Sequence, residues 1–134
     1  MSSSLIQTSN QSLQNVDVNS IISLGSVQRR FGCNCKLSGN AIEVNGSGYY
    51  VVSASITATP TSAGNVTVTM YEDGSPYTGA TATSSVSTVG NSTNLSIETT
   101  IRKGCCDYGL SNLTFVLMAG AGVINNISVR VEKA

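Results

Sequence analysis

The chain has 134 residues, of which 40% are hydrophobic and only 10% are charged. Seven basic and seven acidic residues cancel to zero net charge, so neither nucleic acid nor an anionic membrane is an expected partner. This length suits one domain with a real core, and the alternating Val, Ile and Leu residues argue against a disordered chain.

The first 24 residues are predicted to form an N-terminal arm that includes at most a first strand. Residues 1–7 have neither a basic n-region nor a continuous apolar h-region, so no secretory signal is predicted. Nor does the chain contain a run of about 18 apolar residues that would span a bilayer. The arm has too little apolar area for its own core but enough to dock on a partner, through Leu5, Ile6, Leu13, Val16 and Val18.

Residues 25–134 are predicted to form a β-sandwich domain. Its clearest strand is Gly48–Pro60, where apolar and polar side chains alternate with a period of two. Asn45-Gly46 favours a hairpin before this strand, and Asp73-Gly74 favours a turn after the next one. We expect about eight to ten strands and no helix, a pattern typical of an all-β sandwich or barrel.

An apolar segment near the C-terminus predicts a subunit interface. In residues 113–118, Leu113, Phe115 and Leu117 are expected to face the core, which leaves Val116 and Met118 facing outward. An exposed apolar row of this kind usually marks a contact surface. The expected interface residues are Tyr49, Tyr71, Val116 and Met118.

Three segments together resemble a known family. They are Gly48–Ser53, Ala63–Gly74 and Ile127–Val131, and their succession is similar to the compact jelly-roll of the C1q and tumour-necrosis-factor-like superfamily. Within it, the chain looks like small phage and Firmicutes proteins of the capsid-decoration or head-fibre type, and residues 29–34 look like proteins encoded among phage virion genes. The resemblance implies a jelly-roll that forms homotrimers.

Hydrolase triads are excluded because the chain contains no His. Seven carboxylates remain, mostly in turns or on polar strand faces, where solvated surface charge is the simpler interpretation. The Ala119–Gly122 segment precedes a strand rather than a helix, so it does not form a phosphate-binding loop. We therefore expect a protein without enzymatic activity and without a cofactor.

The four cysteines leave three interpretations open. Cys33 and Cys35 would project to the same face of a strand, while Cys105 and Cys106 are adjacent in a loop. A disulfide between the two pairs would close a loop of about 70 residues and add about 4 kcal/mol on a chain-entropy estimate. Zinc binding by the four thiolates is the second interpretation, although Cys-x-Cys and Cys-Cys are tighter than the usual spacing of structural zinc sites. Reduced thiols are the third interpretation.

Two functions follow from these expectations. The first is a homotrimeric structural protein on the surface of a phage virion, bound to the major capsid protein or another virion component through the arm. It would be made in the bacterial cytoplasm. The alternative is a phage or bacterial surface adhesin that recognises host glycans through exposed loops, with tyrosines such as Tyr49 as an apolar platform.

Overall fold

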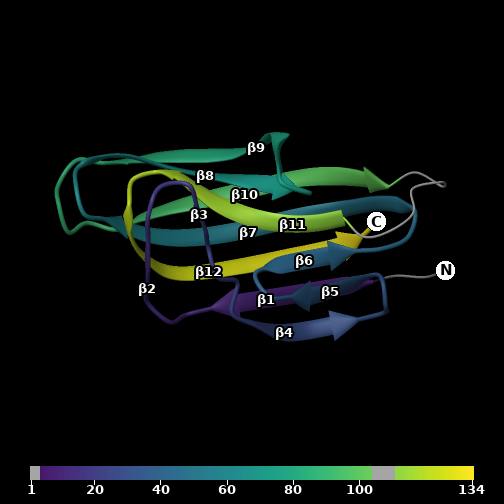
Figure 1. Cartoon of the computed structure of the whole chain (residues 1–134). Helices are drawn as coiled ribbons and strands as arrows, with labels where there is room; N and C mark the ends of the chain where they lie inside the picture. The colour runs from purple at the N-terminus through teal and green to yellow at the C-terminus, as the bar shows by residue number, and fades with distance from the viewer. Residues whose placement is uncertain (1–3, 104–110) are drawn as a thin grey trace.

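The computed structural model describes residues 4–103 and 111–134 and shows two antiparallel β-sheets packed face to face (Figure 1). These residues form twelve strands and no helix. The predicted all-β sandwich is confirmed. No helix capable of crossing a membrane occurs within the described ranges.

Sheet 1 contains the longest strand, β7, together with the first and the last strand of the described chain. Its strand order is β10-β7-β12-β1-β4, and the short β2 also pairs with β12. The bounds are β1 Leu5–Asn10, β2 Gln14–Val16, β4 Ser26–Phe31, β7 Gly48–Pro60, β10 Thr93–Lys103 and β12 Gly122–Lys133.

Sheet 2 packs across the core from sheet 1. Its strand order is β5-β6-β11-β8-β9, and the two-residue β3 also pairs with β11. The bounds are β3 Ser20–Ile21, β5 Cys35–Ser38, β6 Ala41–Val44, β8 Gly64–Glu72, β9 Ser75–Val86 and β11 Ser111–Ala119.

Strand β7 is the centre of sheet 1 and has the bounds that the sequence predicts. It pairs with β10 on one side and β12 on the other. Tyr50, Val52 and Ile56 are fully buried, whereas Ser55 between them is exposed. The two-residue alternation therefore does orient one face of this strand to the core.

Two turn predictions have opposite outcomes. Asp73-Gly74 connects β8 to β9, and both residues have positive φ angles, 52° and 83°, which a tight hairpin turn requires. The predicted hairpin at Asn45-Gly46 is wrong, because β6 belongs to sheet 2 and β7 to sheet 1. This turn carries the chain from one sheet to the other.

The core lies between the two sheets. Its largest fully buried side chains come from both, which makes the molecule one packing unit. They are Tyr50, Phe115, Ile6, Ile22, Leu24, Ile42, Ile56, Met70, Ile101, Leu113, Leu117 and Ile124. The predicted inward orientation of Leu113, Phe115 and Leu117 is confirmed.

The prediction of an N-terminal arm outside the domain is wrong. Strand β1 lies inside sheet 1, paired with β12 on one side and β4 on the other. Ile6 is fully buried and Val16 is 5% exposed, so two of the predicted attachment residues belong to the core. The backbone of Asn19 donates to the Leu117 carbonyl at 2.7 Å, which ties the rest of the segment to sheet 2.

The error has a physical reason. Apolar residues in the first 24 positions are widely spaced, so the sequence alone does not show whether they fill their own core or a partner's. In the structure the segment runs from sheet 1, which contains β1 and β2, to sheet 2, which contains β3. It buries Ile6 and Val16 in the first part and Ile22 in the second. Leu13 and Val18 are the predicted attachment residues that remain exposed, at 72% and 43%.

Candidate functional site

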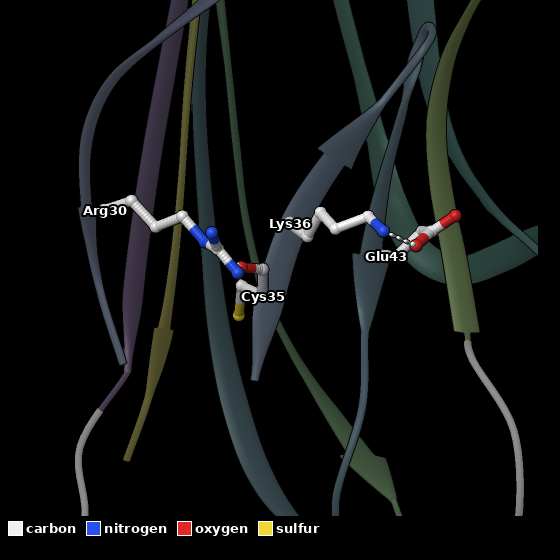
Figure 2. Close-up of polar contacts among 4 residues, drawn as sticks. All are labelled: Arg30, Cys35, Lys36 and Glu43. Atoms are coloured by element: carbon white, nitrogen blue, oxygen red, sulfur yellow. Dashed lines mark hydrogen bonds and ion pairs between the residues drawn. The ribbon is translucent and has the colours of Figure 1, made fainter. Parts of the chain in front are cut away.

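A polar corner forms where β4 ends and β5 begins. The side chain of Arg30 on β4 extends toward β5, and its Nε donates to the carbonyl of Cys35 at 2.8 Å (Figure 2). Lys36 points the other way, with its Nζ 3.8 Å from an oxygen of Glu43 on β6. The Arg30 contact joins the edge of sheet 1 to the edge of sheet 2, whereas the Lys36–Glu43 pair lies within sheet 2.

A pocket of about 210 Å³ lies in this corner. Its lining is polar and charged, and both signs of charge are present. The lining residues are Arg30, Cys33, Asn34, Lys36, Glu43 and Asn45. The pocket therefore suits a small polar or charged group rather than an apolar ligand.

Asn34 fixes the backbone at the floor of the corner. Its Nδ2 donates to the Asn45 carbonyl at 2.7 Å, and its Oδ1 accepts from the Ser4 hydroxyl at 2.5 Å. The hydroxyl of Tyr50 lies 2.9 Å from the carbonyls of both Asn45 and Gly46. Burial raises the pKa of Tyr50 above its usual value, so this hydroxyl stays protonated and able to donate.

The two described cysteines do not share a face. Strand β5 begins at Cys35, and Cys33 lies before it in a bend that follows Gly32, whose φ is 78°. Cys33 is exposed and Cys35 is buried, so the expectation that both project to one side is wrong. Desolvation raises the pKa of Cys35 to about 11 despite the opposing effect of Arg30 and Lys133.

Cys105 and Cys106 lie outside the described residues, so the cross-link to the 33/35 pair stays a prediction. Both described cysteines are free thiols. Within residues 4–103 and 111–134, no group of three or more acidic or cysteine side chains is placed to hold a metal ion.

The outward face of sheet 1 forms a second candidate site, a shallow trough of about 330 Å³. Three serines from three adjacent strands lie in one register row within it: Ser96, Ser55 and Ser128. We call this row the serine row. Small hydroxyl side chains leave the middle of the sheet low and uncharged.

Opposite charges flank the serine row. In the adjoining register row, Glu98 of β10 pairs with Ser53, which in turn pairs with Arg130 of β12. The two charged residues are thus two strands apart, or about 10 Å. Arg130 donates to Glu132 at 3.0 Å, whereas Glu98 has no ion-pair partner within the described residues.

The sequence analysis did not predict a site on this face, although the polar residues that form it can be seen in the sequence. The outward positions of β7 include Ser53 and Ser55, and those of β10 include Ser96 and Glu98, so polar residues alternate with apolar ones in both segments. That the serines of the serine row become neighbours depends on the strand order β10-β7-β12, which brings together residues far apart in the chain.

The four predicted interface residues lie on different faces. Tyr49 is 55% exposed and has the outward parity of sheet 1. Tyr71, Val116 and Met118 have the outward parity of sheet 2, where the Tyr71 hydroxyl lies 3.5 Å from the Met118 sulfur. Val116 is only 7% exposed, so the expectation that it forms an exposed apolar row with Met118 is wrong for Val116.

The burial of Val116 follows from its neighbours. Tyr71 pairs in register with Thr114, and Val116 pairs with Thr69, one step along the same face. To reach the sulfur of Met118, the Tyr71 ring must extend along the strands past this pair. The side chains cover Val116 within one copy of the chain, without a second subunit.

No protein-family model matches the sequence, and the search of curated proteins finds nothing similar to it. Solved structures share the fold. Murine APRIL at pH 5.0 superposes with a TM-score of 0.71 at 11% identity, over 99% of this chain and 100% of that one. The globular domain of zebrafish complement 1qA gives 0.71 at 8% identity, over 96% and 94%.

A phage protein has the same fold. The PRD1 vertex protein P5 superposes with a TM-score of 0.64 at 12% identity, over 97% of this chain and 95% of that one. The chain therefore has the C1q/TNF-like jelly-roll fold, as the sequence resemblance indicated.

Proposed function

We propose that this protein is a non-enzymatic structural component of a phage virion surface and that it acts as a homotrimer. The observation that carries the proposal is the fold match, over nearly the whole of both chains, to a protein described as a phage vertex protein. Because the match spans the full domain, the shared feature is the whole sandwich rather than one motif.

The outward face of sheet 1 supports association of identical copies. It is broad, its middle is low, and the charges beside the serine row are of opposite sign on different strands. A head-to-tail contact would bring Glu98 of one copy toward Arg130 of the next. Heterologous contacts of this kind form a closed ring when the rotation between copies closes.

The proposed partner is the major capsid protein or another component of the virion surface. Attachment through a separate N-terminal arm is not part of the proposal, since β1 is an interior strand of sheet 1. The contact with the particle would instead use surfaces of the folded domain. The corresponding location is the outside of the virion.

Gradient-purified particles of the phage that encodes the chain provide the test. We expect the protein in the particle band by mass spectrometry, and antibody labelling on the outside of intact particles by electron microscopy. Light scattering of the isolated protein should give three times the 13.8 kDa chain mass. Absence from purified particles, together with binding of the protein to host cells or glycans, would favour the adhesin instead.

A further inference from the structure

Strand β4 is an open edge of sheet 1. It is the last strand in the order β10-β7-β12-β1-β4, so it pairs with β1 on one side only (Figure 1). All six of its residues are exposed, whereas every other strand in the described chain has at least one buried or half-buried residue. Its outer backbone groups are available to another strand.

The side chains of β4 give this edge a definite chemistry. Phe31 is 63% exposed and Val27 is 41% exposed. Between them lie Arg29 and Arg30, and neither has a carboxylate partner within the described residues, where the ion pairs are Lys36–Glu43 and Arg130–Glu132. The edge therefore combines apolar contact area with two uncompensated positive charges.

The charges argue against a second copy as the occupant. Antiparallel pairing of two β4 strands through their centres would place Arg29 of one copy diagonally next to Arg30 of the other on the same face, and like charges within reach of each other across a strand pair destabilise it. An added strand with acidic side chains has the reverse effect. Charge complementarity thus selects an acidic segment.

The polar corner offers a further contact to such a segment. Its pocket of about 210 Å³ lies between β4 and β5 and includes Arg30 and Lys36. The one acidic residue in the lining, Glu43, is already engaged with Lys36. A carboxylate from an added strand could lie beside Arg30, whose Nε is occupied by the Cys35 carbonyl while its outer nitrogens remain available.

We propose that β4 is the docking site for an extended acidic segment of another protein, which adds to sheet 1 as a further strand. Main-chain hydrogen bonds to the β4 edge supply affinity, and carboxylates beside Arg29 and Arg30 supply selectivity. Apolar side chains of the segment contact Phe31. This inference does not depend on the proposed virion role.

Synthetic peptides test the proposal with the full-length protein. The probe is a fluorescein-labelled octapeptide of sequence Val-Val-Glu-Glu-Val-Val-Glu-Glu, which carries carboxylates on both faces of a strand, as Arg29 and Arg30 require. Its control is the same octapeptide with lysine in place of glutamate. We expect the glutamate peptide to bind at least about tenfold more tightly by fluorescence anisotropy, with an affinity that falls as salt rises. N-methylation of its alternate amides should abolish binding, because it removes main-chain donors.

Matched variants locate the site. Arg29→Glu should weaken the glutamate peptide about tenfold or more and Arg29→Gln should weaken it less, while Arg102→Glu on β10, the opposite edge of sheet 1, should leave it unchanged. Circular dichroism confirms that each variant is folded. Equal binding of both peptides, insensitivity to N-methylation, no effect of Arg29→Glu, or no binding at all would each overturn the proposal.

Discussion

Cys35 shows how one buried side chain links the fold to pH. Its pKa rises from the ordinary 9.0 to about 11 because burial disfavours the thiolate, and Arg30 and Lys133 only partly offset this. Cys33, two residues earlier, is exposed. The two cysteines therefore differ in burial because strand β5 begins at Cys35.

This difference predicts a pH dependence of stability. Between pH 9 and 11 the unfolded chain loses the Cys35 proton while the folded chain keeps it, so the free energy of unfolding should fall as pH rises through this range. Urea unfolding of the reduced protein should show a smaller fall in the Cys35→Ala variant. The comparison variant is Cys33→Ala, which removes an exposed thiol and leaves the buried Cys35 in place. An unchanged slope in Cys35→Ala would contradict the assignment.

Strands β7 and β1 show that alternating apolar and polar residues can predict a strand but not its neighbours in the sheet. The pattern in β7 was sufficient to predict its bounds, because every second residue from Tyr50 to Pro60 is buried and Gly48 and Pro60 mark the ends of the segment. Strand β1 has six residues, and its position between β12 and β4 depends on pairing with residues more than a hundred positions away. The same limit explains the wrong hairpin at Asn45-Gly46, since local turn chemistry does not say which sheet the next strand joins.

The candidate sites also combine features that the sequence could predict with features that it could not. The cysteines and Tyr49 could be identified as residues of interest from their type alone. The contact of Arg30 with the Cys35 carbonyl and the alignment of the serine row depend on which strands become neighbours. Residue types are local properties, whereas these arrangements arise from long-range pairing.

Because β1 belongs to the core, alanine substitutions at Ile6 and Leu13 should differ sharply in their effect on the free energy of unfolding. Ile6→Ala removes a fully buried side chain between two strands and should cost about 2 to 5 kcal/mol of unfolding free energy. Leu13→Ala, at a position that is 72% exposed, should change it by no more than about 0.5 kcal/mol. Chemical denaturation of both variants measures this. Equal small losses would restore the view of the segment as a detachable arm.

At the scale of the whole molecule, the two sheets present different outward faces. The face of sheet 2 has hydrogen-bonded threonine pairs, Thr67 with Thr83 and Thr69 with Thr81, each at 3.0 Å, so its polar groups are satisfied within one copy. The face of sheet 1 has the trough with Glu98 left unpaired among the described residues. Only the second arrangement improves when another copy approaches, because a partner's cation would pair with Glu98.

A single substitution in the serine row should separate assembly from folding. Ser55 is exposed at the centre of the row, so Ser55→Arg leaves the core intact but places a long charged side chain where the copies would meet. Light scattering should show the 13.8 kDa monomer in place of the proposed trimer, with an unchanged circular dichroism spectrum. Thr83→Arg, at an exposed position on the face of sheet 2, is the control and should remain trimeric. If Ser55→Arg stays trimeric while Thr83→Arg dissociates, the copies associate through sheet 2, and Tyr71 and Met118 become the residues to test.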